Sequence, residues 1–290
     1  MTVLVKGTYR KYGYEFATLG LRSGEYSLTC VPERGGSLIS FTKGDTEFIW
    51  VRDHNLESTE RIRCGIPILF PSCSSPDNGV HVFNGKSYPM ENHGFADLLP
   101  WEVKQADETG ITLALKANGL TRFVYPFDFR LEQRYELHGN TAVLSLTVEN
   151  AGEEPMPFSV GYHPYFKVSA LDNVSFDIKA KTLSDSWKGE QPKAPEVITL
   201  PHAENGADNV IRMMTGTESP MVLRDSGTGH RLTVSFSSRF TNGVLWQQEA
   251  ESFVCMEPWN GWANSLNEEG KHEVLNPKET MTFEWEITID

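Results

Sequence analysis

The sequence lacks most signals of a helical, secreted, membrane-bound or nucleic-acid-binding protein. Helical periodicity is scarce in its 290 residues, and no apolar run is long enough to cross a bilayer. Residues 1–16 lack the apolar core of a signal peptide. Positive charge is in deficit, because 26 lysines and arginines stand against 39 acidic residues, a net charge of −13. We therefore expect a cytoplasmic protein with neither a nucleic-acid partner nor a membrane partner.

Paired cysteines and metal-binding spacings are also missing. The four cysteines form no C-x-x-C pair and lie among apolar neighbours, which predicts reduced and mostly buried thiols: Cys30, Cys64, Cys73 and Cys255. No H-x-H or H-x-x-x-H pair occurs, so we expect no metal site. The G-x-S-x-G, G-x-G-x-x-G and Walker motifs are absent as well. A covalent hydrolase or a nucleotide-dependent enzyme is therefore unsupported.

What the chain has instead is strand after strand. Apolar and polar residues alternate with a period of two, and turn pairs such as Asn84-Gly85 separate the runs. Hairpins or strands are predicted over residues 36–51, 80–90, 129–150, 221–238 and 281–289. Only the short stretches 55–62 and 263–270 look helical. We expect one all-β domain over residues 1–290, an antiparallel sandwich that carries its function on loops.

Four stretches interrupt the alternation with residues that strands do not need: 63–71, 91–101, 161–166 and 255–262. His163 precedes Pro164, which fixes its own φ and favours extended geometry before it, so this histidine is held rather than loose. Glu257 lies among apolar and aromatic residues, where lost solvation would raise its pKa and make it a better proton acceptor near neutral pH. His163 could instead have only a packing role, and Glu257 could instead be an exposed acid at a strand end. The residues alone leave both alternatives open.

Other side chains in these stretches suit a carbohydrate. Trp246, Trp259 and Trp262 could each stack on the apolar face of a sugar ring or pack in the core. Arg63 could hydrogen-bond a polyol or pair with a buried acid. His93 sits beside glycine and phenylalanine, and a hydrogen-bonded structural role for it is equally open. The residues alone do not choose between these interpretations.

Together the motifs resemble the aldose 1-epimerase (galactose mutarotase-like) family, in particular its branch that includes hexose-phosphate mutarotases. The segment "RCGIP" is similar to R-G-G-I-P of that branch, "NHGFA" to H-G-[FL]-A, "GYHPYF" to H-x-Y-F and "CMEPW" to C-x-E-P. The segment "ADNVI" resembles a shorter motif with an aspartate before two apolar residues. Five motifs in the family's order cover nearly the whole chain, and they are specific to the family rather than to one sugar.

The resemblance implies a β-supersandwich that interconverts the α and β anomers of an aldohexose without a cofactor. By motif position, Glu257 would be the general base and His163 the general acid, facing each other across the sugar ring. Trp259 would contact the small-molecule sugar. The hydroxyls and the ring oxygen would be held by Arg63, His93 and Asp208. The sequence does not indicate an oligomeric state.

Three other functions stay open from the sequence. A non-catalytic carbohydrate-binding sandwich would use the same tryptophans and arginine. A glycoside hydrolase or lyase would need two carboxylates, for which Glu257 and Asp208 are available. A hexose-6-phosphate mutarotase is the third alternative.

Position 97 bears on that third alternative. In the phosphosugar branch H-G-[FL]-A is followed by arginine, whereas here it is followed by Asp97 with no obvious basic cluster nearby. We therefore predict that glucose 6-phosphate is handled at least tenfold less efficiently than free aldohexoses, a gap of about 1.4 kcal/mol. Alternatively, Asp97 faces solvent and Lys86, Arg122 or another distant residue supplies the phosphate contact.

Overall fold

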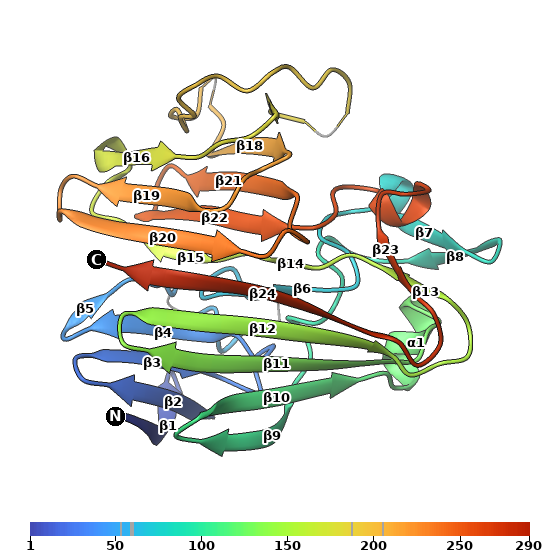
Figure 1. Ribbon diagram of the computed structural model, residues 1–290, viewed down its shortest axis with the longest axis horizontal. Helices are drawn as coiled ribbons and strands as arrows, with labels where there is room; N and C mark the ends of the chain where they lie inside the picture. Colours follow the sequence, from blue (N-terminus) through green and yellow to red (C-terminus); the bar gives the residue numbers. More distant parts are fainter. Residues whose placement is uncertain (53, 59–60, 187, 205) are drawn as a thin grey trace.

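The computed structural model describes residues 1–52, 54–58, 61–186, 188–204 and 206–290, and antiparallel sheet dominates them (Figure 1). A five-stranded sheet runs in the order β1 (Thr2–Lys11), β2 (Tyr14–Ser23), β3 (Tyr26–Cys30), β4 (Leu38–Lys43) and β5 (Thr46–Glu47). An eight-stranded sheet runs in the order β16 (Val174–Asp177), β19 (Met221–Asp225), β20 (His230–Phe236), β24 (Thr280–Ile289), β12 (Thr141–Asn150), β11 (Phe129–His138), β10 (Gly110–Lys116) and β9 (Glu102–Asp107).

The third large sheet is the one that carries the candidate site. It has seven strands, in the order β17 (Thr182–Ser184), β18 (Asn209–Thr215), β21 (Asn242–Gln248), β22 (Phe253–Trp259), β14 (Gly161–Tyr162) and β6 (Ile68–Leu69), with β15 (Tyr165–Lys167) also paired to β22. Two small sheets pair β7 (Val80–Phe83) with β8 (Lys86–Pro89) and β13 (Met156–Phe158) with β23 (Glu273–Leu275). The helical elements are α1 (Gly119–Val124) and the 3-10 turns η1 (Asp77–Gly79), η2 (Leu171–Asn173) and η3 (Ser265–Asn267).

One large apolar core joins the three main sheets. Buried residues of all three sheets belong to the same cluster. The Tyr162 ring of the seven-stranded sheet lies 4.9 Å from the Trp285 ring of the eight-stranded sheet, and the Tyr162 hydroxyl bonds the amide oxygen of Gln133 at 2.7 Å. A bridge between Leu38 and Ile66 links the five-stranded sheet to the segment that leads into β6. The eight-stranded sheet thus packs against the other two.

The predicted strands are confirmed. β11 and β12 pair in unbroken register, and their buried residues alternate as the sequence indicates. β7 and β8 meet at Asn84 and Gly85, which both have positive φ, as a tight hairpin turn requires. The galactose mutarotase-like antiparallel sandwich expected from the resemblance is therefore the observed fold.

The predicted helices are wrong. Residues 55–58 form turns and bends, residues 59–60 lie outside the described part of the chain, and the segment 263–270 contains only the 3-10 turn η3. The one α-helix in the described residues, α1, was not expected. Asn118 caps it by accepting hydrogen bonds from the backbone N–H groups of Leu120 and Thr121. Two exposed apolar residues, Leu120 and Phe123, hide its amphipathic pattern.

Two further findings concern the cysteines and the presence of membrane-spanning helices. All four cysteines are buried and free. Within the described ranges, no helix has the length and apolar character needed to cross a membrane.

Candidate active site

The seven-stranded sheet turns one face away from the core, and the candidate site lies on that face. Directly opposed residues of neighbouring strands point to the same side of a sheet. Leu245 of β21 and Met256 of β22 are opposed, and both belong to the core. Val244 and Glu257, the next opposed pair, therefore point the other way. There, together with Trp259, they line a cavity of about 240 Å³.

Strand β14 brings His163 to this cavity. Gly161 is opposed to Trp259, and a Cβ on Gly161 would lie only 2.7 Å from Cδ1 of Trp259, so this approach of two strands requires glycine. The backbone N–H of His163 donates to the carbonyl oxygen of Pro67 at 3.1 Å. The His163 ring stacks on Tyr165 with centroids 4.7 Å apart. The histidine is thus held through its backbone and through one ring face.

The loop at residues 91–97 supplies His93. Gly94 has a φ of 72°, and a Cβ there would collide with the carbonyl oxygen of Phe70, so the loop can dock only with glycine at this position. The Nδ1 of His93 bonds the carbonyl oxygen of Cys73 at 2.5 Å, which assigns the ring proton to Nδ1 and leaves Nε2 as an acceptor. Burial lowers the pKa of His93 to about 4, so the ring is neutral at pH 7.

Glu257 is a buried carboxyl group whose side chain is only 1% exposed. The Nε1–H of Trp259 donates to its Oε2 at 3.0 Å, and its Oε1 lies 3.5 Å from Nε2 of His163. Desolvation raises the pKa of Glu257 well above its usual value, and the Trp259 hydrogen bond opposes part of that rise. Oε1 is therefore the oxygen placed to exchange a proton.

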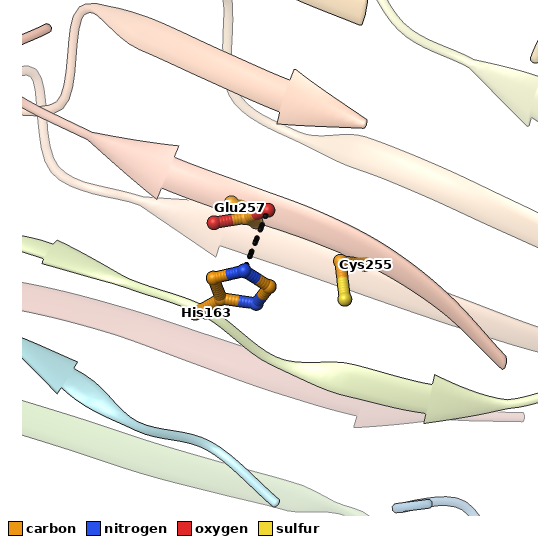
Figure 2. A group of neighbouring side chains, drawn as sticks. All are labelled: His163, Cys255 and Glu257. Atoms are coloured by element: carbon orange, nitrogen blue, oxygen red, sulfur yellow. Dashed lines mark ion pairs between the residues drawn. The ribbon is translucent and has the colours of Figure 1, made fainter. Parts of the chain in front are cut away.

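The imidazole of His163 is also largely removed from water. Burial lowers the pKa of His163 well below its usual value, and the neighbouring His93, Arg61 and Arg63 lower it further. Its Nδ1 is buried without a hydrogen-bond partner among the described residues, so no contact fixes the ring tautomer. Figure 2 shows the ring and the Glu257 carboxyl facing each other. Both shifts favour the uncharged forms, a protonated Glu257 beside a neutral imidazole.

The 3.5 Å separation corrects one expectation. We expected His163 to face Glu257 across a sugar ring, but a ring does not fit between two atoms this close. Oε1 of Glu257 and Nε2 of His163 instead lie side by side on the cavity wall.

Cys255, two residues before Glu257 on β22, completes a group of three possible metal ligands (Figure 2). One ligand atom from each of Cys255, His163 and Glu257 lies within 4.8 Å of the others. Burial raises the pKa of the Cys255 thiol well above its usual value. Because a thiol must lose its proton to bind a metal, burial of Cys255 opposes the binding of a cation here.

Asp97 is buried and its charge is paired with a cation. Both expectations for it, a solvent-facing side chain and a carboxylate with no basic group nearby, are therefore corrected. Its side chain is 1% exposed and forms an ion pair with Arg61, whose second terminal nitrogen donates to the carbonyl oxygen of Gly94 at 2.8 Å. Burial raises the pKa of Asp97 to about 6, and Arg61 opposes this rise. Arg61 thus neutralises Asp97 and also supports the loop that carries His93.

The structure brings all but one of the predicted site residues together. The cavity is lined by Arg63, His93, His163, Glu257 and Trp259. The Arg63 side chain is exposed and forms no ion pair with any described residue. Asp208 is the exception, because it is exposed, accepts a hydrogen bond from Asn209 at 2.5 Å and lies outside the cavity lining.

Sequence reasoning missed Arg61 and Tyr165 as residues of the site. Arg61 had a detectable signal, since it is a second arginine two residues before Arg63, and both border the cavity. Tyr165 had none of its own, because an aromatic residue after His163-Pro164 is equally typical of a core strand.

Comparisons with known proteins agree with this fold. The family model for aldose 1-epimerase matches residues 18–288. The chain is 26% identical to protein LacX (chromosomal) of Lactococcus lactis subsp. lactis over 296 residues, covering 91% of this chain and 97% of LacX. The solved structure of Slr1438 from Synechocystis sp. PCC 6803 aligns with a TM-score of 0.84 and 26% identity over 99% of this chain and 96% of that one. A galactose mutarotase related enzyme from Lactobacillus acidophilus aligns with a TM-score of 0.80 and 23% identity, over 99% and 97% of the two chains.

The match over most of the chain identifies its family. The protein belongs to the aldose 1-epimerase family. Membership indicates an isomerase class and a small-molecule sugar as substrate.

Proposed function

We propose that the protein is a mutarotase that interconverts the α and β anomers of a free aldohexose, with Glu257 and His163 as its acid–base pair. The observation that carries this proposal is the 3.5 Å contact between Oε1 of Glu257 and Nε2 of His163 on the wall of a small cavity. A buried carboxyl beside a buried imidazole serves proton transfer at two adjacent oxygens better than it serves stability, because burying both groups costs free energy.

In ring opening, Glu257 takes the proton of the C1 hydroxyl while His163 gives a proton to the ring oxygen. The bond from C1 to the ring oxygen breaks, its electron pair stays on that oxygen, and C1 becomes an aldehyde carbon. Rotation about C1–C2 then presents the other face of the carbonyl. In closure the new hydroxyl attacks C1 and returns its proton to His163, while Glu257 protonates the carbonyl oxygen. Each positioned group contributes on the order of a hundred- to ten-thousandfold.

The pair holds a single proton throughout this cycle. After ring opening the proton is on Glu257 and His163 is neutral, which is the distribution that burial favours. Opening itself starts with the proton on His163. Sugar hydroxyls that donate to Oε1 would stabilise the carboxylate in that state, as Trp259 Nε1–H does at Oε2.

The other lining residues fit the binding of a polyol. His93 offers Nε2 as an acceptor, and the exposed Arg63 offers donors. Trp259 orients Glu257 and also borders the sugar. Asp208 takes no part in the proposal.

Two rival functions fit less well. A carbohydrate-binding sandwich would use Arg63 and Trp259 but would have no need of a desolvated acid–base pair. A glycoside hydrolase would need a second carboxylate beside the scissile bond. Asp97, the other carboxylate in the cavity lining, is already paired with Arg61.

Two-dimensional exchange NMR of anomeric protons tests the proposal with a panel of aldohexoses. We expect anomeric exchange to be faster with the protein than in buffer for at least one sugar. No acceleration for any sugar would favour the binding module and overturn the proposal. Release of reducing sugar from aryl glycosides would instead support a hydrolase.

A further inference from the structure

A second and larger cavity adjoins the catalytic one. It measures about 980 Å³ and lies where β18 and β22 end and β21 begins, at the right-hand ends of these strands in Figure 1. We call it the cationic cleft, and its lining includes Lys181, Thr215, Arg239, Asn242, Trp262 and Lys271.

Strand register shows that the cationic cleft and the catalytic cavity share one face of the sheet. Thr215, Asn242 and Trp259 are opposed across β18, β21 and β22 and form one row. Thr215 and Asn242 line the cleft, whereas Trp259 lines the catalytic cavity. The next row on this face contains Val244 and Glu257. Rows are about 7 Å apart along a strand, so the cleft begins one row from the acid–base pair.

The charge of the cationic cleft is opposite to that of the whole protein. Its lining has three cations, Lys181, Arg239 and Lys271, and one carboxylate, Glu273, a formal charge of +2 with neutral histidine in a chain of −13. Among the described residues, no carboxylate forms an ion pair with these three cations. Lys271 instead places Nζ 5.2 Å from the ring centroid of Trp262. Such a local excess of positive charge favours an anionic ligand.

The cleft also has the groups that bind sugar hydroxyls. Gln191 Oε1 and Ser237 Oγ line it, and both atoms are buried without a hydrogen-bond partner in the described part of the chain. Buried polar atoms normally have partners, so these two indicate a ligand with hydrogen-bond donors.

We propose that the cationic cleft binds a uronate unit linked to the aldose whose C1 lies at Glu257. Arg239, Lys181 and Lys271 bind the uronate carboxylate, and Gln191 and Ser237 bind hydroxyls of the uronate ring. The substrates then include short acidic oligosaccharides with a free reducing end. This inference rests on the proposed function and adds a substrate class to it.

Exchange NMR with two reducing disaccharides tests the inference. They share the reducing unit, and the second unit is a uronate in one and the matching neutral hexose in the other. We expect the wild-type protein to favour the acidic disaccharide about tenfold in kcat/KM at low salt, and less at high salt, because exposed charges are screened within about 10 Å at 0.1 M salt. The double variant Lys181→Gln, Arg239→Gln should bring the ratio near one.

A matched control is Lys116→Gln, which removes an exposed lysine from β10 of the eight-stranded sheet and should keep the wild-type ratio. The same ratio in the wild type and the double variant would overturn the inference. Glucose 6-phosphate tests whether the cleft binds a phosphate group instead of a uronate carboxylate. If the double variant lowers turnover of glucose 6-phosphate by as large a factor as that of the acidic disaccharide, the cleft binds a phosphate and the uronate assignment is wrong.

A binding measurement separates failure of this inference from failure of the proposed function. Calorimetric titration of the acidic disaccharide into Glu257→Gln protein reports on the cleft without turnover. We expect the Lys181→Gln, Arg239→Gln changes to weaken binding about tenfold in that background, and unchanged affinity would overturn the inference. Binding without catalysed exchange of any sugar would refute the mutarotase and leave the cleft assignment standing.

Discussion

The two faces of strand β22 bury neighbouring residues for different purposes. Met256 and Glu257 are 0% and 1% exposed. Met256 packs in the large apolar core, where removal of its side chain from water stabilises the fold. Glu257 is turned to the cavity, where loss of water costs free energy and shifts its affinity for a proton. Equal burial therefore predicts opposite consequences for stability and for turnover.

The largest expected effect comes from mutating one residue on each face of β22. Glu257→Gln should lower turnover at least a hundredfold, the scale for loss of a general base, while the free energy of unfolding does not fall. Met256→Ala should instead lower the free energy of unfolding by about 2–5 kcal/mol through a core cavity. Exchange NMR and urea unfolding measure the two effects.

Glu132→Gln on the exposed side of β11 is the matched control for charge and should change neither quantity. Exchange rates like those of the wild type in Glu257→Gln would remove Glu257 from the mechanism.

The second prediction concerns the coupling of the pair. His163→Asn should lower turnover by a factor similar to that of Glu257→Gln, because proton donation and removal occur together. The double variant should be little worse than either single variant. Saturation kinetics by exchange NMR on all three proteins gives the comparison, and fully additive losses would show that the groups act independently.

The smallest expected effect is a change of preference at Asp97. Free aldohexoses should be handled at least tenfold more efficiently than glucose 6-phosphate, since the charge of Arg61 is already neutralised by Asp97. Asp97→Asn would release that charge, so we expect relative efficiency on the phosphate to rise several-fold.

Asp128→Asn, which removes a carboxylate from the exposed ion pair with Arg122, should leave the preference unchanged. If Asp97→Asn also leaves it unchanged, the Arg61–Asp97 pair does not set the preference.

Local patterns predicted the strands well because period-two alternation needs no knowledge of partners. The 129–150 hairpin is the clearest case, since its turn and both buried faces follow from nearest neighbours. The helix predictions were wrong for a related reason. Caps such as Asn118 and turns such as η3 depend on single residues rather than on a repeating pattern.

The site was predictable in its members but not in its geometry. Five of the six expected residues line one cavity, because their motifs specify the strand and the loops that carry them. The side-by-side arrangement of His163 and Glu257 depends on the register of β14 against β22. The pairing of Arg61 with Asp97 joins residues 36 positions apart. Both are tertiary facts that no local window contains.

The pH dependence of kcat/KM tests most directly the claim that the two buried groups share one working proton. When both groups are protonated no base is left, and when both have lost their protons no acid is left, so the profile should be bell-shaped. Because burial lowers the pKa of His163 and raises that of Glu257, the acidic limb should lie well below pH 6.5 and the alkaline limb well above pH 4.5. Glu257→Gln should remove the acidic limb, because only His163 is then left to titrate and activity falls as it loses its proton. An acidic limb at pH 6.5 or higher in the wild type, or an acidic limb that persists in Glu257→Gln, would contradict the shared proton.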